Sequence, residues 1–368
     1  YAREAVALYQ NVLDLPSQYV TVGVAREIAY ALSGLPGQEA LALQLYRQLT
    51  TQQADDVGLL LQRIVIEKQL GYASTEDIRR LLSTLSLTTI TPSLQREIAK
   101  GLVRVDPPEP ELLPVYESLI AVGIQEPLLY YRVAQIAIAE RDYETARGAL
   151  ARYAERSSST NYLSSGLLLL ADIERRESNL VGSADIYDAI LRSQPTNQAI
   201  INSALSGYAT VLEAQGLNRE ALAIYDQLFA QSPQPNTVQV LKRTQLAYLA
   251  DVLSQQQAEA LLIRSFERGI VVTPDDFYAQ GELATNLERF DLAEQAYNSL
   301  REAYPDEISG ALALAGLYQQ QQRFTEAVDL YEEVLTVAPD NRTAQEALAN
   351  LSQSFLLRRG FQPDWERY

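Results

Sequence analysis

The sequence predicts an all-α protein built from stacked pairs of antiparallel helices. The first observation is an internal repeat, because a shift of 34 residues brings Gly281 onto Ala315, Ala293 onto Ala327, Tyr297 onto Tyr331 and Pro305 onto Pro339. The second is the composition, with 47% hydrophobic and 21% charged residues, which is enough apolar material for a core. The longest apolar stretch, Leu167–Ala171, is far shorter than the ~18–20 residues of a membrane-spanning helix.

Segment 271–340 holds two repeats with the same order of residue types: aromatic or apolar, small, apolar, then Ala, aromatic, apolar and Pro. They are marked by Phe277, Gly281, Ala284, Ala293, Tyr297, Leu300 and Pro305, and by Ala311, Leu314, Ala315, Tyr318, Ala327, Tyr331, Val334 and Pro339. Small residues let the first helix of a pair (helix A) approach the second (helix B) closely. The prolines end helix B, since proline cannot continue its hydrogen bonds.

This pattern resembles that of the tetratricopeptide repeat family. The resemblance implies one continuous, right-handed superhelical solenoid of about nine helix pairs, closed by a C-terminal capping helix. Because a single pair cannot bury its own apolar face, the pairs must stack on one another.

Segment 127–270 continues the pattern with longer spacing. Its repeats carry Tyr130, Val133, Ala134, Ala137, Ala146, Leu150 and Tyr153; then Leu167, Leu170, Ala171, Ser183, Tyr187, Ile190 and Pro195; then Leu205, Tyr208, Ala209, Leu212, Ala221, Tyr225, Leu228 and Pro233. The segments Val238–Ser254 and Ala258–Arg268 form a further pair that has lost most of the signature. The loop Ser157–Thr160 replaces a terminal proline and is a candidate flexible point.

Segment 1–126 is the most divergent, and we interpret it as starting mid-repeat, in a fragment or processed chain. Ala5–Leu13 and Glu39–Leu49 are each predicted as a helix B, and two degenerate pairs follow, Asp55–Leu70 with Thr75–Leu85 and Leu94–Val103 with Glu111–Ile120. In segment 341–368, an amphipathic helix over Arg342–Leu357 is expected to cap the array. The aromatic tail after it is expected to pack over this last helix, with a docking peptide as the alternative.

Charge and composition exclude several classes of function. The 30 Lys and Arg against 47 Asp and Glu leave a net charge of -17, which repels nucleic acid and anionic membranes. With no His, Cys or Met, the chain lacks Ser-His-Asp and Cys-His nucleophiles, thiol chemistry and His/Cys zinc sites. We therefore predict no cofactor, no metal and no membrane insertion. The absence of Cys permits an oxidising compartment, so a periplasmic or exported location is slightly favoured over the cytoplasm.

The candidate binding residues are those between the framework positions of helix A, because helix A lines the concave face of such a solenoid. They are Tyr131, Gln135, Asp172, Arg175, Arg176, Thr210, Glu213, Tyr278, Glu282, Asn286 and Gln319. This polar set of mixed charge suits an extended peptide or a partner helix, with Tyr and Arg as anchors, and an ordinary solvated groove is the alternative. The paired Lys and Asn with which some members of the family hold chaperone tails are absent, so we do not expect that ligand.

Adjacent carboxylates in the sequence are expected to cap helices rather than to act in catalysis. Asp275 and Asp276 follow Pro274 at a predicted helix start, where acidic residues cap the helix. A hydrolase or transferase would need two carboxylates on neighbouring helices A, such as Glu213 and Glu282. We expect the intervening pair to hold these two apart, since each helix adds ~10 Å, and we predict that the chain is not an enzyme.

The sequence thus predicts a non-catalytic scaffold or adaptor that binds one or more proteins on its concave face. Long divergent arrays of this kind also resemble the periplasmic arms of bacterial cellulose and alginate export systems. The alternative function is therefore that of an arm in an exopolysaccharide synthesis and export complex, with envelope or secretion proteins as partners.

Overall fold

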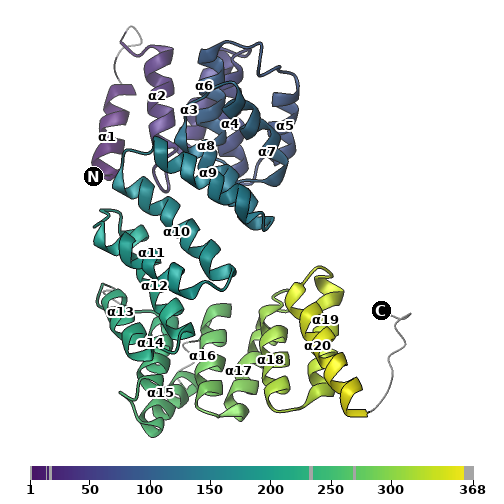
Figure 1. The fold of residues 1–368 in the computed structure, drawn as a ribbon. Coiled ribbons are helices and arrows are strands. Elements are labelled where there is room, and N and C mark those ends of the chain that lie inside the picture. Colours follow the sequence, from purple (N-terminus) through teal and green to yellow (C-terminus); the bar gives the residue numbers. More distant parts are fainter. Residues whose placement is uncertain (1, 14, 16–18, 232–234, 268–270, 360–368) are drawn as a thin grey trace. The chain divides into compact units, whose positions relative to one another are not determined.

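The computed structural model describes residues 2–13, 15, 19–231, 235–267 and 271–359 (Figure 1). Every regular element in these ranges is a helix, so the predicted all-α repeat fold is confirmed. The chain divides into two compact units, Tyr1–Ile201 and Asn202–Tyr368. The division falls within one helix, α12 (Gln198–Ala214).

The first unit begins with a single helix B and continues with alternating helices A and B. Its elements are α1 (Ala2–Leu13), α2 (Val22–Leu32), α3 (Glu39–Gln52), α4 (Val57–Gln69), α5 (Thr75–Ser83), α6 (Pro92–Leu102), the 3-10 turn η1 (Pro110–Leu112), α7 (Leu113–Ala121), α8 (Pro127–Ala139), α9 (Tyr143–Arg156), α10 (Thr160–Arg176) and α11 (Leu180–Arg192).

The second unit continues the same alternation to the last described helix. Its elements after α12 are α13 (Asn218–Ala230), α14 (Thr237–Leu249), α15 (Gln255–Glu267), α16 (Pro274–Asn286), α17 (Phe290–Ala303), α18 (Ser309–Gln320), α19 (Phe324–Val337) and α20 (Arg342–Arg359). From α2 to α19 the described helices form the nine predicted pairs, with α1 before them and the capping helix α20 after them. The predicted strap beyond Arg359 lies outside the described residues.

Some helix ends differ from the predicted ones because turn and capping contacts set them. Helix α4 begins at Val57 rather than Asp55, since the Asp56 side chain accepts a hydrogen bond from the Leu59 N–H at 3.0 Å. Helix α14 ends at Leu249, before the predicted Ser254, because Asp251 has a φ of 59° and starts a turn. The predicted helix over Glu111–Ile120 is divided into η1 and α7.

Most turns from helix A to helix B share one geometry. A single residue takes a positive φ, and the N–H of the next residue bonds to the carbonyl five residues earlier, at 2.7–2.9 Å. This is the Schellman arrangement that satisfies the last carbonyls of a helix. The residues with positive φ in these turns are Gly71, Arg141, Ser178, Gly216, Asp251, Glu288 and Gln322.

Helices A and B approach closely where small residues face aromatic rings. A Cβ atom on Gly281 of α16 would lie 2.2 Å from Tyr297 of α17, so only glycine fits at this contact. A Cβ on Gly166 of α10 would lie 3.0 Å from Tyr153 of α9. The role predicted for Gly281 in the repeat is therefore confirmed. The apolar core of the second unit extends from Leu241 to Leu351 through these helix contacts.

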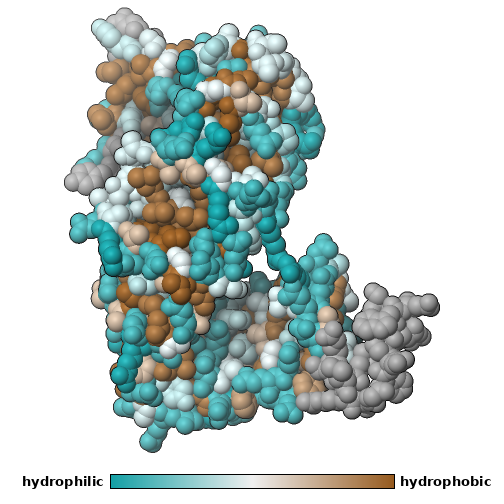
Figure 2. Space-filling view, viewed as in Figure 1, coloured by the Kyte–Doolittle hydropathy of each residue, from teal (hydrophilic) through white to brown (hydrophobic). Residues whose placement is uncertain are grey.

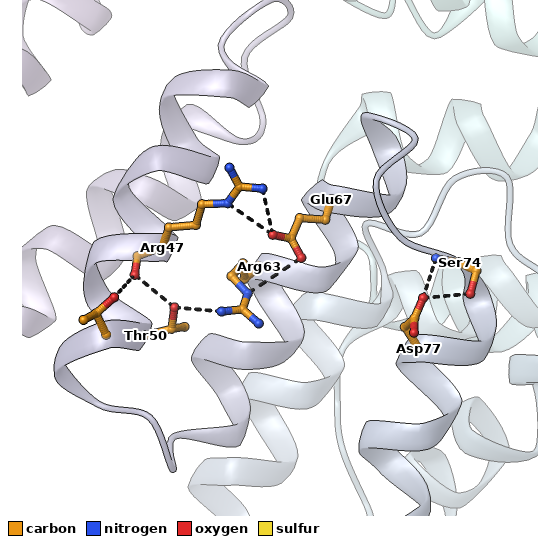
Figure 3. Close-up of polar contacts among 7 residues, drawn as sticks. Arg47, Thr50, Arg63, Glu67, Ser74 and Asp77 are labelled. Atoms are coloured by element: carbon orange, nitrogen blue, oxygen red, sulfur yellow. Dashed lines mark hydrogen bonds and ion pairs between the residues drawn. The ribbon is translucent and has the colours of Figure 1, made fainter.

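Polar contacts also join α3 to α4 and cap the start of α5, as Figure 3 shows. Arg47 of α3 donates from Nη2 to Glu67 Oε1 of α4 at 3.1 Å, and Arg63 Nε lies 3.7 Å from Glu67 Oε2. At the start of α5, Asp77 accepts hydrogen bonds from the Ser74 N–H at 2.9 Å and the Ser74 hydroxyl at 2.8 Å. This capping box, with the acidic residue in the first turn, fixes where α5 begins.

Candidate functional site

The predicted binding residues all lie on helices A, but they belong to two units. Tyr131 and Gln135 are on α8, and Asp172, Arg175 and Arg176 are on α10, all in the first unit. In the second unit, α12, α16 and α18 carry Thr210, Glu213, Tyr278, Glu282, Asn286 and Gln319. Each unit therefore presents its own set of candidate residues.

On α8 the candidate side chains are held by contacts within the unit. The ring of Tyr131 lies 5.2 Å from that of Tyr153, with the planes tilted by 47°, and burial raises the pKa of Tyr131. Gln135 Oε1 accepts a hydrogen bond from Arg132 Nη1 at 2.8 Å. Arg132 is itself buried, and it donates to the Val103 carbonyl and pairs with Asp106. Gln135 thus helps to satisfy a buried guanidinium.

On α10 the three charged candidates pair with one another. Asp172 pairs with Arg175 through the latter's Nη2 and with Arg176 Nε at 2.7 Å. These partners stand three and four residues apart in one helix, the spacing at which side chains meet on a helix surface. The two arginines predicted as anchors therefore share one carboxylate.

The helices A of the second unit bring four polar side chains together. Lys242 Nζ of α14 lies 2.9 Å from Oε2 and 3.2 Å from Oε1 of Glu213, which is on α12. Gln245 Nε2 donates to the same Glu213 Oε1 at 3.1 Å, and Gln245 Oε1 accepts from Lys242 at 3.3 Å. Glu282 Oε2 of α16 lies 3.9 Å from Lys242 Nζ, beyond hydrogen-bond distance. We call Glu213, Lys242, Gln245 and Glu282 the α12–α14–α16 cluster.

This cluster corrects the prediction that Glu213 and Glu282 are held too far apart to act on one group. The intervening helix α14 does separate α12 from α16, but its Lys242 reaches both carboxylates. The lysine stem is long and flexible enough to bridge one stacking interval in each direction. The correction does not create a pair of free carboxylates, because the ammonium group of Lys242 lies between them.

On α16, Tyr278, Glu282 and Asn286 lie one turn apart along a single helix face. The Tyr278 side chain is 39% exposed, and its ring lies 6.1 Å from the ring of Tyr297 at an angle of 49°. Asn286 Nδ2 donates to the Glu282 backbone carbonyl at 2.9 Å, so Asn286 supports the helix rather than projecting from it. Burial, with a smaller contribution from Glu213, raises the pKa of the Glu282 carboxyl against the opposing effect of Lys242.

The two remaining candidates bond within their own unit. The Thr210 hydroxyl donates to the Ser206 carbonyl at 3.0 Å, one turn earlier in α12, and Thr210 stays exposed. Gln319 Oε1 of α18 accepts from the Tyr331 hydroxyl of α19 at 3.2 Å, which joins helix A to helix B. Neither residue contacts the α12–α14–α16 cluster through any hydrogen bond between described residues.

Sequence reasoning missed Lys242 and Gln245, both on α14. The helix pair α14–α15 has lost most of the repeat signature. The binding positions on its helix A could therefore not be assigned from the framework residues. One signal was available, because the sequence holds three lysines, Lys68, Lys100 and Lys242, and each of them lies on a helix A. Each of them also pairs with a glutamate.

Other features of the described residues involve none of the predicted binding residues. Asp276 caps α16 by accepting from the Thr273 N–H at 3.0 Å, as predicted for this pair of aspartates. No group of three or more metal-ligating side chains occurs among the described residues, and none of their helices has the length and apolar character needed to cross a membrane. An open depression of about 460 Å³ lies beside Arg47 and Tyr72.

Apolar side chains also gather on the surface over α10 and α11, as Figure 2 shows. These helices carry three large exposed apolar residues, Tyr162, Leu163 and Val181. The α10–α11 surface thus differs in chemistry from the charged α12–α14–α16 cluster.

Family comparisons agree with the helix pairs. Two models described as tetratricopeptide repeat match the chain, over residues 131–198 and 308–351. The chain contains tetratricopeptide repeats in both segments. The matched segments include α9 to α11 and α18 to α19. Tetratricopeptide repeats generally serve as modules for protein–protein interaction, and this general role extends to the present chain.

Solved structures of other repeat proteins are similar at low identity. The C-terminal part of a TPR repeat-containing protein from Cytophaga hutchinsonii is 16% identical over 65% of this chain and 93% of its own, with a TM-score of 0.39. A tetratricopeptide repeat protein from Parabacteroides merdae is 17% identical over 64% and 94%, with a TM-score of 0.40. A chain of the APC/C hetero-tetramer Cut9-Hcn1 is 13% identical over 95% and 66%, with a TM-score of 0.45. No curated protein matches this tetratricopeptide-repeat chain.

Proposed function

We propose that this tetratricopeptide-repeat protein is a non-catalytic scaffold that binds a segment of a partner protein on the helix A side of its second unit. The observation that supports the proposal is the face of α16. There Tyr278 is 39% exposed and Glu282, one turn later, keeps 35% of its side chain exposed. Tyrosine is among the residues that most often anchor a partner protein at an interface.

Site-specific crosslinking tests this function. The photoreactive residue benzoylphenylalanine replaces Tyr278 in the full chain, and a matched protein carries it in place of Val252. Val252 is also in the second unit and is 62% exposed, but it lies in the turn between α14 and α15. Both proteins are irradiated in an extract of the native cell, and crosslinked peptides are identified by mass spectrometry.

We expect the Tyr278 position to crosslink to a defined polypeptide, at the same partner residues in repeated experiments. The Val252 position should give only a weak and scattered background. Equal crosslinking from both positions, or none from Tyr278, would contradict binding on the helix A side of α16.

The alternative function, an arm of an exopolysaccharide export complex, is supported by the acidic and Cys-free sequence. Such a chain would work in an oxidising compartment and would bind envelope proteins. The same crosslinking experiment separates the two functions. Partners from the cell envelope or a polysaccharide secretion system would favour the export arm and a periplasmic location, and soluble cytosolic partners would exclude it.

A further inference from the structure

Glu282 differs from the other charged residues predicted at binding positions, because its carboxylate accepts no hydrogen bond from a described residue. Asp172, Arg175 and Arg176 pair with one another on α10. Glu213 receives hydrogen bonds from both Lys242 and Gln245. Glu282 has only the ammonium group of Lys242 at 3.9 Å, and no described residue donates a hydrogen bond to its carboxylate. The Glu282 carboxylate can therefore accept hydrogen bonds from a further cation.

The charge around Glu282 favours a cationic ligand over an anionic one. Two carboxylates surround one ammonium group in the α12–α14–α16 cluster, which leaves one negative charge on a partly buried surface. Between residues 202 and 368 the sequence holds 23 Asp and Glu against 12 Lys and Arg, so the wider field has the same sign. Such a field attracts basic segments and repels acidic ones.

Tyr278 supplies a flat surface next to this carboxylate. It stands four residues before Glu282 on α16, a spacing at which side chains are neighbours on a helix. Its ring is tilted against Tyr297 at 6.1 Å, and Gly281 keeps α16 close to that ring, so the position of Tyr278 is fixed by packing. No hydrogen bond joins the Tyr278 hydroxyl to another described residue.

We propose that Tyr278 and Glu282 together bind an arginine side chain that the partner protein presents in an exposed segment. The guanidinium group pairs with the Glu282 carboxylate and stacks on the Tyr278 ring. Arginine fits better than lysine, because a planar guanidinium can make two parallel hydrogen bonds to a carboxylate while lying on an aromatic face. This inference rests on the proposed function and specifies the chemistry of the partner.

The first unit holds a natural counterpart of this site without its charge. Tyr131 and Gln135 stand on α8 at the same four-residue spacing as Tyr278 and Glu282. Gln135 is neutral, and its oxygen already accepts from Arg132. The substitution Glu282→Gln therefore gives α16 the same tyrosine and glutamine pair that α8 carries.

Peptide selection on the full chain tests the inference. A phage-displayed library of random dodecapeptides is selected in parallel on the parent chain, on Glu282→Gln and on Glu332→Gln. Glu332 is exposed on the helix B α19, so its variant removes the same charge at a place away from the site. The selected peptides are sequenced, and their arginine content is compared with that of the unselected library.

We expect arginine to be enriched several-fold in peptides selected on the parent chain and on Glu332→Gln, and to show no enrichment on Glu282→Gln. Equal arginine enrichment on all three proteins would overturn the inference. Peptides selected without arginine would also overturn it but would leave the scaffold function standing. Failure of the parent chain to select any peptide would count against both.

Binding of one selected peptide then measures the contact directly. Its arginine is replaced by citrulline, which keeps the shape and removes the charge. Affinity for the parent chain should fall about tenfold, and affinity for Glu282→Gln should change less than about twofold. Tyr278→Ala should weaken the arginine peptide and leave the citrulline peptide almost unchanged. The same loss with citrulline on both proteins would place the arginine elsewhere.

Discussion

Lys242 pairs with Glu213 and lies 3.9 Å from Glu282, so it reduces the negative charge of the α12–α14–α16 cluster. The framework pattern could not predict this pairing. The pattern correctly placed Glu213, Tyr278 and Glu282 on helices A. It could not say which side chains are neutralised, because that depends on how far a long lysine reaches across stacked helices. The site was therefore predictable as a set of positions but not as a set of charges.

At the residue scale, Glu282→Gln should leave the fold intact. Burial raises the pKa of Glu282, so its ionisation reduces the stability of the folded chain as pH rises from the ordinary value of 4.5 through the raised one. At pH 7 the variant should be as stable as the parent chain, or more stable by up to about 1 kcal/mol. Below pH 4.5, where Glu282 is protonated in both states, the difference should disappear.

Urea unfolding followed by circular dichroism at pH 7 and pH 4 measures this difference. Glu332→Gln serves as the control, since its side chain is exposed and its stability should match that of the parent chain at both pH values. A Glu282→Gln variant that is clearly less stable at pH 7 would show that Glu282 serves the fold through Lys242.

At the element scale, the contact between α16 and α17 depends on a missing side chain. Gly281→Ala would place a Cβ 2.2 Å from the Tyr297 ring, and this ring cannot move without disturbing the core. We expect a loss of about 1–3 kcal/mol in the free energy of unfolding. Gly316→Ala on α18 is the matched control, because nothing lies within 4 Å of a Cβ there. It should be neutral or stabilising by up to about 1 kcal/mol.

Denaturant unfolding of Gly281→Ala, Gly316→Ala and the parent chain measures the two changes in the free energy of unfolding. A neutral Gly281→Ala would mean that Tyr297 can rotate away, and that the glycine is not needed for close packing of the pair.

Most elements were predictable because each repeat specifies its own helix pair. In the consensus-like repeats, small residues mark the contact between helix A and helix B, and a proline marks the end of helix B. Neither signal depends on distant parts of the chain. The ends of α4 and α14 were less predictable, since they depend on the Asp56 cap and on the turn at Asp251. Neither contact is encoded by apolar spacing.

At the scale of the whole molecule, stacking makes each pair depend on its neighbours alone. Gly281→Ala should therefore speed amide hydrogen exchange in α16, in its partner α17 and in the adjoining α14 and α18 of the second unit. Exchange in α2 to α6 of the first unit should stay at the parent rate. Hydrogen exchange read by mass spectrometry of peptic fragments tests this, with Gly316→Ala as the control. Faster exchange throughout both units would show that the chain unfolds as one cooperative body.

The turns between helix A and helix B affect which mutations the repeat array can tolerate during evolution. Five of them place Arg141, Ser178, Asp251, Glu288 and Gln322 in the left-handed region, where glycine would fit at a lower conformational cost. None of these turn positions belongs to the Tyr278 and Glu282 face. Substitution by glycine at one of these turn positions should therefore stabilise the folded chain. Such a substitution could compensate for a mutation that changes the recognition surface and destabilises the fold.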